Sequence, residues 1–80
     1  MTKASFTKLQ GRYVAFIAMY TKVHGLPPAE ADIQRYFRVT PPTVHQMVLT
    51  LEKRGMITRV PGQARSISVV LSPDRLPKLE

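Results

Sequence analysis

The sequence predicts a mostly helical domain that ends in a small β-hairpin, and two observations lead to this fold class. Apolar residues recur every three or four positions in three stretches between residues 7 and 54, which is the period of an amphipathic helix. From residue 56 onward the stretches "MITRV", "PGQAR" and "SISVVL" have the pattern of strand, turn and strand. The 80 residues suffice for one domain, which we expect over residues 1–71, followed by a C-terminal tail at residues 72–80.

The first helix is expected between residues 7 and 24. Thr7, followed three residues later by Gln10, has the form of a capping box. Gly25 suits the C-terminal cap, and Pro27 stops the helix from continuing. The residues that we expect to face the core are Leu9, Tyr13, Phe16, Ile17, Tyr20 and Val23.

A short second helix is expected at roughly residues 29–37. Two acidic residues in its first turn, Glu30 and Asp32, favour a helix start because their negative charges attract the positive N-terminal end of the helix dipole. Its buried stripe is expected to consist of Ile33, Tyr36 and Phe37.

The third helix begins at two prolines and is predicted over residues 41–54. Thr40 is a suitable N-cap, and Pro41 stands at the first helical position, where a missing N–H costs nothing. Pro42 is also tolerated, since a backbone N–H at this second position would have no partner within the helix. The tight turn at residues 38–40 gives the spacing of a helix-turn-helix. We expect Val44, Met47, Val48 and Leu51 to face inward.

The hairpin completes a winged helix-turn-helix, with a wing of two or three strands. Ile57 is expected to pair with Ile67 or Val69 on the inner face of the wing. Two arginines, Arg59 and Arg65, flank a turn that contains one glycine and no acidic residue.

The composition favours a nucleic-acid partner. Twelve basic residues against five acidic ones give a net charge of +7, a strong positive field for so short a chain. An anionic membrane surface is the second alternative, and a basic protein without such a partner is the third. The longest apolar run, "YVAFIAMY", is shorter than the ~20 residues that a membrane span needs, and the N-terminus has no signal-peptide core. We therefore expect a cytoplasmic protein that does not span a membrane, and we expect its partner to be double-stranded DNA, with no membrane partner.

The outward face of the third helix carries side chains that can read DNA. Its N-terminal residues are expected to meet base edges in the major groove, whose width admits an α-helix. Gln46 suits a bidentate contact to adenine, Thr43 offers a hydroxyl and a methyl group, and His45 can donate or accept. The residues expected at the DNA backbone, or in the wing at residues 61–65, are Thr40, Thr50, Lys53, Arg54, Arg59, Gln63 and Arg65. Leu49 lies on the same face, and the sequence gives it no role.

The order of these motifs resembles the N-terminal DNA-binding domain of LexA-type repressors. The matching stretches are "HGLPP" after the first helix, "ADIQ" in the second, "TPPTV" at the start of the third, "LEKRGMI" at its end and "PGQARSISV" in the wing. The resemblance covers roughly residues 6–71. It implies that Pro42, Thr43, His45 and Gln46 read the operator, and that the chain is a transcriptional regulator of the repressor type.

The chain also differs from LexA-type repressors in one respect. LexA-type repressors carry a C-terminal Ser-Lys peptidase domain, and no residues of this chain correspond to it, so we expect no self-cleavage and no enzymatic activity. A homodimer on DNA is compatible with the sequence.

Other functions have weaker support. No cysteine or acidic cluster accompanies His24 or His45, so we expect no metal, no cofactor and no small-molecule substrate. Ser66 and Ser68 have no nearby base in the sequence. The alternative that stays open is a winged-helix protein-interaction module that does not bind DNA.

Overall fold

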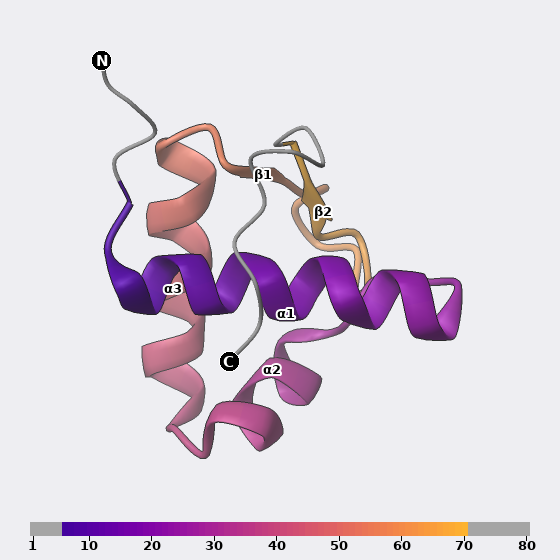
Figure 1. The fold of residues 1–80 in the computed structure, drawn as a ribbon, viewed down its shortest axis with the longest axis horizontal. Helices are drawn as coiled ribbons and strands as arrows, with labels where there is room; N and C mark the ends of the chain where they lie inside the picture. The colour runs from indigo at the N-terminus through magenta and orange to yellow at the C-terminus, as the bar shows by residue number, and fades with distance from the viewer. Residues whose placement is uncertain (1–5, 71–80) are drawn as a thin grey trace.

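The computed structural model describes residues 6–70. It contains three helices, α1 (Lys8–His24), α2 (Glu30–Phe37) and α3 (Pro41–Lys53), and two strands, β1 (Ile57–Thr58) and β2 (Ser68–Val69). In Figure 1, α1 runs across α3, with α2 on one side of α1 and the hairpin on the other. The predicted class, a winged helix-turn-helix with a two-stranded wing, is confirmed. The predicted tail at residues 72–80 lies outside the described residues.

The helix boundaries follow from the predicted caps. The Thr7 N–H donates to Oε1 of Gln10 at 3.1 Å, and the Gln10 N–H donates to Oγ1 of Thr7 at 3.0 Å, which is a complete capping box. Gly25 ends α1 at a φ of 76°, a left-handed conformation that glycine adopts without steric cost. Thr40 caps α3, and its side chain accepts from the Thr43 N–H at 3.4 Å.

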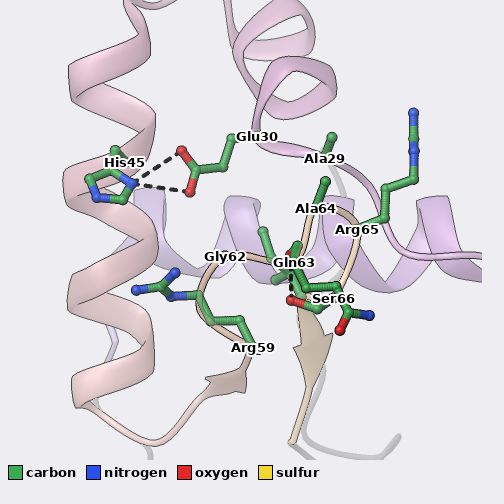
Figure 2. Close-up of a pocket in the computed structure, with 10 residues that line it drawn as sticks. Ala29, Glu30, His45, Arg59, Gly62, Gln63, Ala64, Arg65 and Ser66 are labelled. Atoms are coloured by element: carbon green, nitrogen blue, oxygen red, sulfur yellow. Dashed lines mark hydrogen bonds and ion pairs between the residues drawn. The ribbon is translucent and has the colours of Figure 1, made fainter.

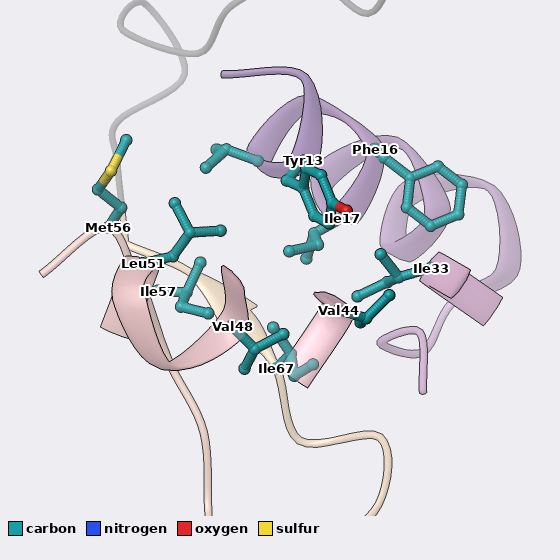
Figure 3. Packing of buried hydrophobic residues seen from close by; sticks show 11 residues of the cluster. Tyr13, Phe16, Ile17, Ile33, Val44, Val48, Leu51, Met56, Ile57 and Ile67 are labelled. Atoms are coloured by element: carbon teal, nitrogen blue, oxygen red, sulfur yellow. The ribbon is translucent and has the colours of Figure 1, made fainter. Parts of the chain in front are cut away.

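The core joins all three helices to the hairpin. Val44, Val48 and Leu51 of α3 have no exposed surface, and Figure 3 shows them among buried side chains of α1, α2 and the hairpin. Met47, also expected inside, is half-buried. Most of the predicted inward face of α3 is therefore correct.

The predicted inward face of α1 is wrong at both of its ends. Leu9 is 47% exposed and Val23 is 66% exposed, whereas Val14 and Ala15, which were not predicted to be inside, are buried. The middle of α1 packs against α2 and the hairpin as well as α3, so a wider face is covered there. The ends of this 17-residue helix extend past those elements.

Aromatic rings attach α2 to α1. Tyr13 stacks on Phe37 with ring centroids 4.1 Å apart and planes within 2°, and Phe16 stacks on Tyr36 at 4.4 Å. Burial raises the pKa of the Tyr13 hydroxyl. The prediction that Tyr36 is buried is wrong, because one side of its ring packs on Phe16 while 43% of the residue stays exposed.

The wing is a short antiparallel pair. Ile57 is opposite Val69 and Thr58 is opposite Ser68, so of the two predicted partners of Ile57 the second is confirmed. The ladder is shorter than the predicted strands because residues 60–66 form a loop. Ser66 closes this loop: its Oγ accepts from the Val60 N–H at 2.8 Å and lies 3.0 Å from the Gln63 carbonyl oxygen.

No helix within residues 6–70 has the length and apolarity that a membrane crossing requires.

Candidate nucleic-acid interface

The N-terminal half of α3 presents an exposed polar face. Pro42, Thr43, His45 and Gln46, the four residues expected at bases, are all exposed, while Val44 between them is fully buried. The face follows from the helical period, because the buried residues Val44, Val48 and Leu51 turn the remaining positions outward. These side chains are therefore accessible to a ligand as large as a DNA duplex.

A groove of about 490 Å³ runs along one edge of this face. It lies between α3 and the first turn of α1, and its lining residues are Gln10, Pro42, Thr43, Gln46, Met47 and Thr50. Thr50 lines this edge, and its hydroxyl donates to the Gln46 carbonyl oxygen at 2.9 Å. Thr43 is held toward Thr40, with their hydroxyl oxygens 2.8 Å apart.

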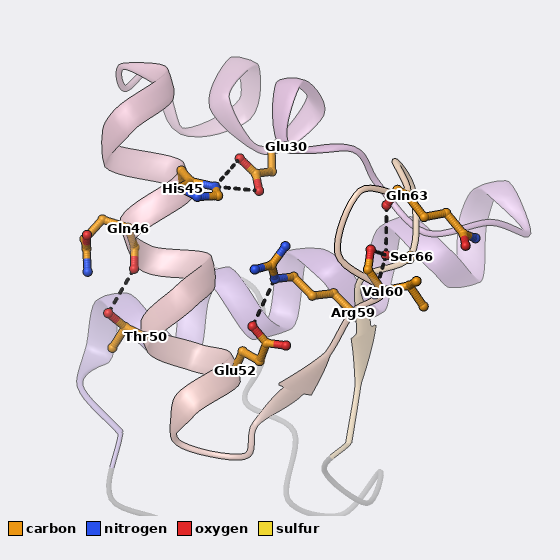
Figure 4. A network of polar contacts seen from close by, with 9 residues as sticks. All are labelled: Glu30, His45, Gln46, Thr50, Glu52, Arg59, Val60, Gln63 and Ser66. Carbon is orange, nitrogen blue, oxygen red and sulfur yellow. Dashed lines mark hydrogen bonds and ion pairs between the residues drawn. The ribbon is translucent and has the colours of Figure 1, made fainter.

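His45 is paired with Glu30 of α2. Its Nδ1 lies 3.2 Å from Oε1 and 3.1 Å from Oε2 of the carboxylate, as Figure 4 shows. An ionised carboxylate only accepts, so Nδ1 carries the hydrogen of this contact. The other ring nitrogen, Nε2, points away from Glu30 (Figure 2).

Arg59 is paired with Glu52. The Nε of Arg59 donates to Oε1 of Glu52 at 3.0 Å, and this pair is among the contacts drawn in Figure 4. Only 19% of the Arg59 side chain is exposed. Arg59 lines a second cavity, of about 370 Å³, between the helices and the wing, with His45 and Glu30 on its helical side (Figure 2).

Arg65 lies on the opposite side of that cavity from His45 and points away from α3 (Figure 2). Its Nη1 lies 3.3 Å from the Tyr20 hydroxyl oxygen, 3.2 Å from the Pro27 carbonyl oxygen and 3.0 Å from Oδ2 of Asp32. The structure thus places this arginine against the link between α1 and α2. Gln63, expected beside it, is exposed at the tip of the wing.

The remaining predicted backbone contacts lie at the two ends of α3. Thr40 is exposed at the start of the helix, where it serves as the N-cap. Lys53 and Arg54 are exposed at its end, and the Arg54 N–H closes the last turn on the Thr50 carbonyl oxygen at 3.0 Å. Leu49 is half-buried.

Sequence reasoning missed the acidic partners of the candidate site. The three carboxylates within residues 6–70 are Glu30, Asp32 and Glu52, and each accepts from a side chain expected at DNA: His45, Arg65 and Arg59 respectively. These partners lie on different elements and are separated by 7 to 33 positions, so no helical or strand period connects them. Within the same residues, no group of three or more His, Cys, Asp or Glu side chains could hold a metal ion.

Comparison with known proteins assigns the family. The LexA DNA binding domain model matches residues 3–66. The LexA repressor of Thermosipho africanus (strain TCF52B) is 43% identical over 68 residues, which cover 85% of this chain and 34% of that protein. The LexA repressor of Pseudothermotoga lettingae is 40% identical over 68 residues, with 85% and 34% covered.

A LexA repressor of Thermosipho melanesiensis is 42% identical over 64 residues, which cover 80% of this chain and 32% of that protein. The chain thus spans about one third of the length of these relatives. The match lies within the DNA-binding part of the family and includes α1, α2, α3, β1 and the loop that follows β1, up to residue 66. The chain belongs to the LexA DNA-binding domain family.

Proposed function

We propose that this chain binds a specific sequence of duplex DNA and represses transcription, with α3 in the major groove. The observation that carries the proposal is the exposed polar face of α3, formed by Thr43, His45 and Gln46 around a buried Val44. An α-helix fits the width of the major groove, where each base pair has its own pattern of donors and acceptors. The relatives are named LexA repressors, which supports the regulatory role.

The base contacts follow from the chemistry of this face. Gln46 offers an amide that can pair with both N6 and N7 of adenine. Thr43 and Pro42 offer apolar surface to a thymine methyl group, and the Thr43 hydroxyl can also serve a base edge. His45 offers Nε2, since Nδ1 is engaged by Glu30.

The phosphate contacts are proposed at the edges of the same surface. Lys53 and Arg54 at the end of α3, Lys8 at the start of α1 and Arg59 beside the wing supply positive charge. Gln63 and the exposed backbone at residues 61–64 would meet the backbone or minor groove. Thr40 would add a hydroxyl contact at the start of α3. The Thr50 hydroxyl would turn from the Gln46 carbonyl oxygen to donate to a phosphate oxygen.

The test begins with selection of bound sequences from random duplex DNA, followed by binding titrations at several salt concentrations. If about five phosphates are contacted, log K should fall with log salt at a slope of about −4 to −5. A palindromic consensus would indicate a homodimer on DNA. A slope near zero, or no enriched sequence, would contradict the proposal and favour a protein-interaction module.

Two variants distinguish the proposed base contact of Gln46 from the proposed phosphate contact of Lys53. Gln46→Ala should relax preference at one base pair and cost about 1–3 kcal/mol of discrimination, because a bidentate contact is lost. Lys53→Ala should weaken all sequences alike and reduce the salt slope by about 0.9, because one phosphate contact is lost. Equal effects of the two variants on specificity and on slope would refute the assigned roles.

A further inference from the structure

The tip of the wing is weakly held by its own hairpin. The ladder consists of two residue pairs, and an isolated hairpin of this size is marginally stable in water. Residues 61–64 are all exposed. Apart from Arg65, the hydrogen bonds of the described loop at residues 60–66 are internal, from Ser66 to Val60 and Gln63 and from the Gln63 N–H to the Val60 carbonyl oxygen.

Arg65 is the residue of this described loop whose side chain forms hydrogen bonds and an ion pair with the body of the domain. Its guanidinium reaches the last part of α1 at Tyr20, the connection to α2 at Pro27 and the first turn of α2 at Asp32. These three acceptors are 33 to 45 positions away in sequence. One side chain thus links the loop to three places outside the wing: α1, the α1–α2 connection and α2.

Two features accompany this arrangement: a backbone conformation at Arg65 that costs free energy, and a partner, Asp32, that is already fixed in place. The Arg65 backbone has a φ of 59°, a left-handed conformation that costs a non-glycine residue roughly 1 kcal/mol and that other contacts must offset. Asp32 is itself fixed, because its Oδ2 accepts from the Ala29 N–H at 2.8 Å while only 13% of its side chain is exposed. The hydrogen bond from Ala29 and the charges of Arg65 and Arg35 lower the pKa of Asp32.

We infer that Arg65 is a positioning residue that clamps the wing to the α1–α2 connection, and that its partners Asp32 and Tyr20 set the direction in which the wing meets DNA. This inference rests on the proposed function, and it replaces the sequence-based expectation that Arg65 itself contacts DNA. The clamp holds residues 61–64 in one orientation before binding. The loop therefore loses less conformational entropy when DNA binds, and the affinity is higher.

The experiment compares Tyr20→Phe, Arg65→Ala and the double variant, with Lys53→Ala as the phosphate-contact control. Tyr20→Phe removes only the hydroxyl that faces Arg65, without changing charge. Arg65→Ala keeps a β-carbon, so the backbone preference at this position changes little. Affinity is measured for the selected DNA sequence at several salt concentrations, and the order of the free-protein amides at residues 62–66 is measured by NMR relaxation.

The clamp predicts a specific pattern. Arg65→Ala should loosen the amides of residues 62–66 and weaken binding about two- to tenfold, while the salt slope stays that of the wild type because no phosphate contact is lost. Tyr20→Phe should act in the same direction with a smaller effect. The double variant should bind like Arg65→Ala, since both changes break one unit.

Two results would overturn the clamp. In the first, the salt slope of Arg65→Ala becomes less negative by about 0.9, as expected for Lys53→Ala, and Tyr20→Phe binds DNA as tightly as the wild type or more tightly. Arg65 would then be a DNA ligand. Wing amides that stay ordered in Arg65→Ala would show that other contacts hold the loop. A wild-type protein that binds no DNA, with amides that loosen in both variants, would reject the proposed function and leave the clamp as a structural device.

Discussion

His45 and Glu30 meet between α3 and α2, and this contact determines which imidazole nitrogen is left for the proposed base contact. With Nδ1 hydrogen-bonded to the carboxylate, a neutral ring presents Nε2 as an acceptor, which suits the amino group of cytosine or adenine. The acidic residue therefore need not oppose DNA binding. It fixes the orientation and the tautomer of a side chain proposed to read a base.

The variant Glu30→Gln tests this role. A glutamine amide can accept from Nδ1 or donate to it, so the tautomer of His45 is no longer fixed. We expect relaxed preference at one base pair and about two- to fivefold weaker binding of the best sequence, with an unchanged salt slope. Adding His45→Ala to Glu30→Gln should then have little further effect. Uniformly tighter binding to all sequences would mean that Glu30 only repels phosphates.

At the scale of the elements, α3 depends on its start. Two prolines at the first two positions fix the backbone there, and the Thr40 side chain supplies the cap. The same turn places Thr43 and Gln46 on the exposed face, so the local order of this end determines the geometry of the proposed interface.

The cap is tested by Thr40→Ala with Thr40→Ser as its control. Loss of the hydroxyl leaves the Thr43 N–H without its side-chain partner, and the free energy of unfolding should fall by about 1 kcal/mol. Serine keeps the acceptor and should cost only a fraction of this. Urea denaturation measures both variants, and equal stabilities would show that the long 3.4 Å contact contributes nothing.

At the scale of the whole molecule, Asp32 connects α2 to the wing. Its carboxylate accepts from the start of α2 at Ala29, from Arg35 one turn later and from Arg65 of the wing. These contacts favour the ionised form, so the pKa of Asp32 in the folded protein lies below its ordinary value of 3.8. A carboxyl group of this kind stabilises the fold above that value and loses its contribution as the pH falls through the folded-state pKa.

Comparison of the wild type with Asp32→Asn over the range from pH 7 to pH 2 measures this contribution. The wild type should be the more stable protein at pH 7, and the difference should shrink below about pH 4 as the carboxylate of the wild type is protonated. The asparagine oxygen can still cap α2, so the change reports mainly the loss of charge. A difference that does not vary with pH would contradict the assigned role of the carboxylate.

Most of the fold, and the exposure of the polar face of α3, was predictable from local rules. The capping box at Thr7, the prolines before α3 and the change of period at residue 56 each depend on neighbours within four positions, and they correctly predicted three helices and a wing. The exposure of Thr43 and Gln46 followed from the same helical period. The sequence itself determines these features because they depend on interactions between residues that are close together in the chain.

The tertiary structure alone decided the rest. The ends of α1 are exposed at Leu9 and Val23 because the elements that cover its middle do not extend that far. The partner of Arg65 is Asp32, 33 positions earlier, and only the fold brings the two side chains within 3.0 Å. Periodicity identifies which side of a helix faces inward, but it contains no information about which distant side chain neutralises a given charge.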